Sequence, residues 1–299
     1  MTVSAAISVR GLEMAYGAVR AVQGIDLEVQ RGEIFAFLGP NGAGKTTTLE
    51  ILEGYRRPTA GSVAVLGQDP WNADGGWRAR IGVVLQESEP DPGLTVSEAV
   101  ALYAGYHARP LGVSETLQLV GLEGERDMLA TTLSGGQRRR LDVGLALVGR
   151  PEVVFLDEPT TGFDPAARRA AWAMVEGLRA TGTTVFLTTH AMDEAAHLAD
   201  RIAVLAGGRV IAEGTPATIG GRDTAASIVS FVADLPALPE RFRDRAQLVG
   251  GKVQFESTSP LADLAELAAN GVAVSDLEVR PPSLEDVYLS LTRGPVGVS

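Results

Sequence analysis

The sequence predicts an α/β fold built on a buried parallel sheet, followed by a smaller α+β region. Two apolar runs of strand length, Gly32–Leu38 and Val153–Leu156, each lead directly into a polar loop, and such runs are typical of strands buried on both faces. After about residue 221 the pattern changes to short strands with hairpin turns. We therefore expect two domains, residues 1–221 and 222–299, which agrees with a length of 299 residues at ~150 residues per domain.

The composition is that of an ordinary globular protein, with 45% hydrophobic and 21% charged residues, which argues against disorder as the main state. The absence of cysteine and the presence of only three histidines argue against disulfides and zinc sites. A net charge of −11 argues against a nucleic-acid partner. The longest uncharged stretch, Ala180–Met192, is shorter than the ~18 residues of a membrane span, and no secretory signal is expected, so we predict a cytoplasmic location.

A glycine-rich loop lies between the first apolar strand and a helix-like segment, Thr48–Gly54. The loop reads Gly39, Pro40, Asn41, Gly42, Ala43, Gly44, Lys45, Thr46 and Thr47. It matches G-x-x-x-x-G-K-[ST] in the strand–loop–helix context that gives this motif its meaning. Glycines let backbone N–H groups curve around phosphate oxygens, and the helix N-terminus adds partial positive charge. We expect Lys45 to reach the β and γ phosphates and the hydroxyl of Thr46 to bind Mg²⁺.

The second apolar strand, Val153–Leu156, ends in two acids, Asp157 and Glu158. A buried parallel strand delivers such residues to the carboxyl edge of its sheet, where ligands bind. We expect Asp157 to join the Mg²⁺ shell and Glu158 to accept a proton from an attacking water. Two consecutive acids favour hydrolysis over transfer to a substrate hydroxyl.

The nucleotide is expected to be ATP. GTP-binding proteins usually read guanine with Asn-Lys-x-Asp, and none of the asparagines Asn41, Asn72 and Asn270 is followed by lysine. Tyr16 follows a strand-like segment, Ile7–Arg10, and its ring is able to stack on adenine.

A third motif, Leu133-Ser134-Gly135-Gly136-Gln137, precedes an apolar-periodic helix that runs to Val148. With the two earlier motifs, in this order and spacing, the chain resembles the nucleotide-binding subunit of an ABC (ATP-binding cassette) transporter over about residues 5–220. The resemblance implies a P-loop NTPase cassette, with a mixed sheet, a RecA-like core and a helical subdomain at about 90–150. In this family, Ser134 and the N–H groups of Gly135 and Gly136 face the γ-phosphate held by a second subunit, so ATP joins two copies head to tail.

Three further positions carry roles by resemblance. Gln86, after the strand Ile81–Leu85, matches the glutamine that reaches Mg²⁺ and the attacking water. Asp164 matches the acid of a loop that crosses the dimer. His190, after the strand Thr184–Thr189, matches the histidine that contacts the γ-phosphate. Because these residues accompany Glu158, both sites of a homodimer are expected to hydrolyse ATP.

The region after the linker Gly220-Gly221 is predicted to contain strands and two helices. The strands are expected at Ser227–Val232, Ala246–Val249 and Lys252–Phe255, with a Gly250-Gly251 hairpin turn, and the helices from Ser259-Pro260 to Ala269 and from Ser283 onward. The last helix resembles the C-terminal motif of the daunorubicin-resistance-like exporter branch, although an amphipathic closing helix explains it equally well. The branch implies export of a drug, antibiotic or other amphipathic compound.

The resemblance also implies partners. The chain is expected to power separately encoded integral membrane permease subunits from the cytoplasmic face, through a helical insert at about residues 94–126. Within the insert, Leu102, Tyr103 and Tyr106 are each expected in the core, with a docking surface as the alternative. Two other functions stay open. A soluble ABC-type ATPase of DNA repair or translation usually has two cassettes or a long coiled coil, and a non-catalytic P-loop module would not need Glu158 and His190.

Overall fold

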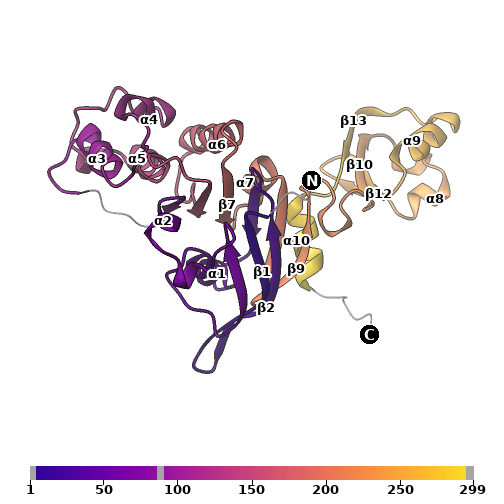
Figure 1. The fold of residues 1–299 in the computed structure, drawn as a ribbon. Helices are drawn as coiled ribbons and strands as arrows, with labels where there is room; N and C mark the ends of the chain where they lie inside the picture. Colours follow the sequence, from indigo (N-terminus) through magenta and orange to yellow (C-terminus); the bar gives the residue numbers. More distant parts are fainter. Residues whose placement is uncertain (1–4, 86–90, 294–299) are drawn as a thin grey trace. The chain divides into compact units, whose positions relative to one another are not determined.

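The computed structural model describes residues 5–85 and 91–293, and it divides into two compact units, Met1–Pro216 and Ala217–Ser299 (Figure 1). Gln86 therefore lies outside the described residues. The boundary falls a few residues before the expected one. Gly220 and Gly221, predicted as a linker, belong instead to a 3₁₀ turn of the second unit, Ile219–Gly221, because a Cβ-free Gly220 allows Val287 of the same unit to pack against it.

The first unit is built on a six-stranded mixed sheet. Its order is β5 (Ile81–Val84), β6 (Val153–Asp157), β7 (Thr184–Thr189), β3 (Ile34–Leu38), β8 (Arg201–Ala206) and β9 (Arg209–Gly214). All pairs are parallel except β8 with β9. Every residue of β3, β6 and β7 is buried, as their continuous apolar sequences predict. The carboxyl ends of these three neighbouring strands therefore bring the glycine-rich loop, the two acids and His190 to one edge of the sheet.

A second, antiparallel sheet completes this unit, in the order β2 (Val19–Val29), β1 (Ile7–Tyr16) and β4 (Ala60–Val65). Its apolar face joins β3 in one core that includes Leu12, Ile25 and Phe35. β1 is longer than its predicted Ile7–Arg10, so Tyr16 ends the strand rather than following it. The reason is a break in register after Val9, which lets the pairing with β2 continue past the polar residues.

Helices surround the two sheets. They are α1 (Lys45–Leu52), α2 (Gly75–Arg78), α3 (Val96–Ala104), α4 (Val113–Leu119), α5 (Gly135–Leu147), α6 (Pro165–Ala180) and α7 (Met192–Leu198), with 3₁₀ turns at Pro70–Asn72 and Ala130–Thr132. α1 begins earlier than the predicted Thr48, because left-handed Gly44 (φ 103°) turns the chain directly into the helix. Within the described residues, no helix has the length and apolar character to cross a bilayer.

Helices α3, α4 and α5 lie together (Figure 1) and share an apolar core of their own, which includes Val100, Leu117 and Leu141. The expectation that Leu102, Tyr103 and Tyr106 are core residues is wrong, because their side chains are exposed. Val96, Ala99 and Val100 form the buried face of α3. Leu102 and Tyr103 lie outside that face, and Tyr106 follows the helix.

The second unit is a four-stranded antiparallel sheet with helices. The strand order is β11 (Gln247–Val249), β12 (Lys252–Ser257), β10 (Ser227–Val232) and β13 (Ser275–Arg280), and the helices are α8 (Glu240–Arg243), α9 (Pro260–Ala269) and α10 (Leu284–Arg293), with a further 3₁₀ turn at Leu235–Ala237. The Gly250-Gly251 hairpin is confirmed: both residues have positive φ between paired β11 and β12. β13 was not predicted, although Leu277 and Val279 alternate with charged residues; all six of its residues are exposed, so this short alternation marks no buried face. The core contains Phe231, Phe242 and Phe255.

Candidate functional site

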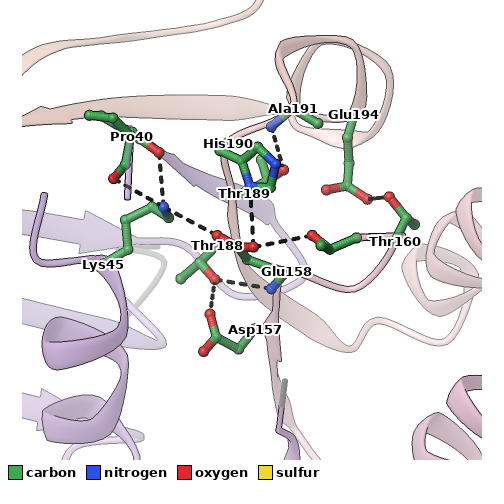
Figure 2. A network of polar contacts seen from close by, with 12 residues as sticks. Pro40, Lys45, Asp157, Glu158, Thr160, Thr188, Thr189, His190, Ala191 and Glu194 are labelled. Atoms are coloured by element: carbon green, nitrogen blue, oxygen red, sulfur yellow. Dashed lines mark hydrogen bonds and ion pairs between the residues drawn. The ribbon is translucent and has the colours of Figure 1, made fainter. Parts of the chain in front are cut away.

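The glycine-rich loop wraps around the side chain of Lys45. The Lys45 ammonium is only 5% exposed, and its Nζ donates hydrogen bonds to the backbone oxygens of Gly39 at 2.9 Å and Pro40 at 3.3 Å (Figure 2). Gly44 must be glycine, since a Cβ there would lie 2.4 Å from the backbone oxygen of Ala21. The loop, including Thr46, lines a hollow of about 470 Å³ whose other walls are Ala21 and Glu158. Backbone N–H groups and one cation around such a hollow suit the phosphates of a nucleotide.

Asp157 ends β6 beside the start of α1. Its carboxylate accepts hydrogen bonds from the hydroxyl of Thr188 and, at 3.5 Å, from Thr46 Oγ1. Beneath it, buried Arg139 of α5 donates to the Asp157 backbone oxygen at 2.6 Å. The hydroxyl of Thr46 and the carboxylate of Asp157 thus converge from two elements, and both are hard oxygen donors of the kind that Mg²⁺ prefers.

Glu158 turns away from Asp157. Its backbone is left-handed, with φ 47°, and its N–H donates to the Thr188 backbone oxygen at 3.1 Å. The carboxylate therefore faces Lys45 Nζ, 3.3 Å from Oε1, and His190 Nδ1, 3.2 Å from Oε2 (Figure 2). Burial acts to raise the pKa of the Glu158 carboxyl, but His190 and Lys45 outweigh burial and hold that pKa below its usual value. Glu158 is ionised at neutral pH and able to accept a proton.

Tyr16 lies beside the glycine-rich loop. Its hydroxyl is 3.4 Å from Thr47 Oγ1, and the guanidinium of Arg56 lies 5.1 Å from the centre of its ring, a cation–π contact. The side chain keeps 41% of its surface exposed. Tyr16 is therefore placed where a base attached to loop-bound phosphates could reach the ring.

The Ser134–Gln137 motif caps α5. Ser134 Oγ accepts from the N–H of Gln137 at 3.3 Å, and Gln137 Oε1 accepts from the N–H of Ser134 at 2.9 Å, a capping box. With Gly135 and Gly136 these residues line a separate hollow of about 1150 Å³. Lys45 does not line that hollow, whereas Glu158 lines both. Within one chain the Ser134–Gln137 motif, called here the signature motif, and Lys45 therefore line different hollows, and Glu158 borders both.

Asp164 also has a local role that the sequence reasoning missed. Its Oδ1 accepts hydrogen bonds from the N–H groups of Ala166 and Ala167, at 2.8 and 2.9 Å, and these bonds lower the pKa of its carboxyl. Asp164 is the N-cap of α6, followed by Pro165. An aspartate directly before a proline at the start of a helical pattern was the available signal.

Comparisons with known proteins agree with this geometry. Residues 22–161 match the family model described as ABC transporter. The chain is 39% identical to Nod factor export ATP-binding protein I of Ralstonia nicotianae, over 96% of this chain and 93% of that protein. It is 38% identical to the daunorubicin/doxorubicin resistance ATP-binding protein of Streptomyces peucetius, over 97% of this chain and 93% of that protein. The chain belongs to the ABC transporter ATP-binding family.

Solved structures give the same result for the fold. A subunit of the cbiONQ transporter complex of Clostridium perfringens superposes with a TM-score of 0.64 at 29% identity, over 71% of this chain and 89% of that one. A dimeric cassette bound to ADP and Pi in a post-hydrolysis state gives 0.63 at 26% identity, over 70% of this chain and 98% of that one. The predicted fold of the cassette is confirmed, and this ABC cassette is a nucleotide-binding ATPase.

Several residues that shape the cassette's site were not identified from the sequence. The hydroxyl of Thr188 donates to the Asp157 carboxylate and accepts from the N–H of Glu158. Arg139 donates to the backbone oxygen of Asp157 at the end of β6. Thr161 donates to Glu158 Oε2 at 3.1 Å. The signal for Thr188 was a polar residue inside an apolar strand, a position that is rare unless the hydroxyl finds a buried partner.

Proposed function

We propose that this chain is the ATP-hydrolysing subunit of an ABC exporter and that it drives separately encoded integral membrane permease subunits from the cytoplasmic face of the membrane. The observation that carries the proposal is the Glu158 carboxylate, held between Lys45 and His190 beside the glycine-rich loop. Export is supported by the names of the relatives, one for Nod factor export and one for daunorubicin resistance. The cargo we propose is a drug, an antibiotic or another amphipathic compound.

In this proposal Thr46 and Asp157, together with Gln86, hold Mg²⁺. The ion would supply positive charge next to the β and γ phosphates. Thr46 Oγ1 and Asp157 Oδ2 are 3.5 Å apart, and the described residues contain no group of three or more His, Cys, Asp or Glu side chains arranged for a metal. Few protein ligands suit Mg²⁺, which usually keeps several waters.

The chain's own residues divide the work of hydrolysis. Lys45 donates to two backbone oxygens and pairs with Glu158. When ATP binds, the γ-phosphate would replace Glu158 as the partner of the Lys45 ammonium. His190 would contact the same phosphate, and Glu158, freed from Lys45, would take the proton of the attacking water. Catalysis then rests mainly on positioning and electrostatics.

A second copy completes each site. We propose that Ser134, Gly135 and Gly136 of one copy face the γ-phosphate held by the other, with Gln137 fixing the motif and Asp164 at the crossing loop. Tyr16 stacks on adenine. The separation of the two hollows within one chain supports this head-to-tail dimer. The soluble-ATPase alternative is not favoured, because the similar proteins named above are export and resistance proteins, and the charge of −11 supports a partner other than nucleic acid.

The proposed catalytic base is tested by Glu158→Gln, which keeps the shape of the side chain but removes its basicity. We expect the ATPase rate to fall by at least ~100-fold, while ATP still binds and still induces dimers, measured by phosphate release, fluorescence titration and gel filtration. Glu176→Gln on α6 is the control, since this carboxyl is half exposed and pairs with His197. Wild-type turnover in Glu158→Gln would disprove the assignment.

The export function needs the membrane partner. We expect a hydrophobic permease encoded next to this gene to co-purify with the chain, and deletion of the pair to raise intracellular accumulation of the exported compound. Isolation of the chain with ribosomes or DNA, and without any membrane protein, would instead favour a soluble ATPase.

A further inference from the structure

A buried carboxylate next to the site has no role in the chemistry proposed above. Glu194 of α7 is 1% exposed. Its Oε1 accepts a hydrogen bond from Thr160 Oγ1 at 2.7 Å (Figure 2) and another from Trp172 Nε1 of α6 at 3.3 Å. Burial of a carboxylate costs free energy unless hydrogen-bond donors surround it. We therefore expect the buried carboxylate of Glu194 to have a specific role.

Its surroundings contain a buried cation as well. Burial lowers the pKa of Arg139, and the carboxylates of Asp142, Asp157 and Glu194 act against that shift. Arg139 in turn donates to the backbone oxygen of Asp157. Glu194 is therefore electrostatically linked to the end of β6, from which Glu158 follows.

The hydrogen bond from Thr160 to Glu194 is one of two contacts that join the loop after β6 to the segment after β7. Thr160 lies two residues after Glu158, on the loop that follows β6, and Glu194 lies one helical turn after His190, which follows β7. The other link is the contact between Glu158 Oε2 and His190 Nδ1, at 3.2 Å. The segments Glu158–Thr160 and His190–Glu194 are thus joined at both ends by side-chain contacts, and together they form a closed ring (Figure 2).

We propose that Glu194 is a positioning residue: through Thr160 it sets the Glu158 carboxylate against His190 for hydrolysis. The proposal rests on the roles given to Glu158 and His190 above. The backbone of Glu158 is left-handed, with φ 47°, a conformation that residues with a Cβ adopt only where the surroundings hold it. The hydrogen bond from Thr160 to Glu194 fixes the chain two residues beyond this strained point.

The test compares Thr160→Val, which keeps the shape but loses the hydroxyl, with Thr160→Ser, which keeps the hydroxyl. We expect Thr160→Val to lower kcat for ATP at least ~10-fold, with KM for ATP and Kd for ADP within ~2-fold of wild type, since the nucleotide contacts remain. Thr160→Ser should stay within ~3-fold of wild type in kcat. Equal kcat values for the two variants would overturn the proposal.

Glu194 itself gives an independent pair of variants. Glu194→Gln retains a carbonyl oxygen for both donors, and its kcat should stay within ~3-fold of wild type, whereas Glu194→Ala should match Thr160→Val. Asp193→Asn is the matched control on the same helix; its carboxylate is exposed and pairs with Arg168 at 2.9 Å, so its kcat should not change. Losses in kcat, ADP binding and melting temperature that run in parallel would show a merely structural role and overturn the proposal.

A double variant separates this proposal from the one on which it rests. In a His190→Ala background the link has no histidine to align, so Thr160→Val should lower the single-turnover rate less than ~3-fold. A further tenfold loss would contradict the positioning role. If His190→Ala alone hydrolysed ATP at the wild-type rate, the assigned role of His190 would fail, whatever the result for Thr160→Val.

Discussion

The two phosphate-binding regions of this cassette differ in how complete they are. At the glycine-rich loop, Glu158 contacts both Lys45 and His190 within a single chain, and Lys45 and Glu158 are nearly buried. At the signature motif, the hydrogen bonds of Ser134 and Gln137 serve the helix cap, and no lysine lines the hollow beside them. The first region holds Lys45 against Glu158, whereas the second presents a capped helix N-terminus and has arginines rather than a lysine along its hollow.

This difference teaches that binding and turnover have separate structural requirements. A single chain has what it needs to hold nucleotide phosphates, because the loop and its lysine are both present. Turnover, in the proposed dimer, also needs the capped helix of a second copy. Variants at the two regions should therefore fail in different ways.

The largest effect is expected at the glycine-rich loop. Lys45→Ala removes the only ammonium lining the described hollow, so affinity for ATP and the ATPase rate should each fall by at least ~100-fold. The chain provides a matched control in its other lysine, Lys252, which pairs with Asp276 at 2.7 Å; Lys252→Ala should bind ATP like wild type. Titration with a fluorescent ATP analogue and phosphate release measure both quantities, and retained affinity in Lys45→Ala would contradict the assignment.

Substitution in the signature motif should prevent dimer formation rather than nucleotide binding by the single chain. Ser134→Asp keeps a good helix N-cap but places a negative charge where the second copy's γ-phosphate is proposed to lie. We expect nucleotide affinity of the single chain to stay within ~2-fold, while ATP-induced dimers disappear and the ATPase rate falls at least ~30-fold. Size-exclusion chromatography with and without ATP measures the dimer. Asn is also a good cap, so Ser134→Asn serves as the uncharged control.

Mixing the two inactive variants tests the comparison directly. A dimer of Lys45→Ala with Ser134→Asp contains one site with both defects and one site with none. Neither variant is expected to dimerise with itself on ATP, so the dimers that form should be mixed. Each mixed dimer has one of two sites intact, and mixing should restore up to about half of wild-type activity. No recovery on mixing, with dimers present, would contradict a site shared between two copies.

The sequence was most informative where a residue type can serve only one purpose. The loop around Lys45 and the acids after β6 were predicted because a glycine-rich loop and consecutive acids have local meanings, whereas the cap formed by Ser134 was found only in the structure. The rule that ligands bind at the carboxyl edge of a parallel sheet placed the acids at that edge, whereas the order of β6, β7 and β3 was found only in the structure. The family resemblance supplied what no local pattern could, namely His190 and the second copy.

Other features depend on contacts between distant residues and left no local pattern. Glu194 is an acid inside a charged helix start, and nothing in its neighbourhood shows that it is buried against Thr160. Tyr103 is a second case, since its exposure depends on which face of α3 meets α4 and α5. Burial of a polar group is decided by tertiary packing, so it is the part that single-sequence reasoning misses.

A buried acid at the end of α1, Glu53, makes the stability of the glycine-rich-loop region depend on pH. Burial, with Asp157 and Glu50, raises the pKa of Glu53 at the end of α1 from 4.5 to about 8. The folded state therefore binds more protons than the unfolded state between these values, and the free energy of unfolding should fall as pH rises through this window. Glu53→Gln should match wild type near pH 4 and exceed it by a few kcal/mol near pH 8, measured by urea unfolding. A difference that is the same at both pH values would rule out this titration.

The smallest effect is expected at Tyr16, at the rim of the first region. Its ring is 41% exposed and already contacts Arg56 on one side, so stacking on adenine adds only about 0.5–1.5 kcal/mol. Tyr16→Ala should weaken ATP binding by about 3- to 10-fold, Tyr16→Phe should bind within ~2-fold of wild type, and kcat at saturating ATP should not change in either. Tyr106→Ala, at a more exposed tyrosine of the helical region, is the control. If Tyr16→Ala bound ATP and inorganic triphosphate with an unchanged ratio of affinities, the ring would make no contact with the base.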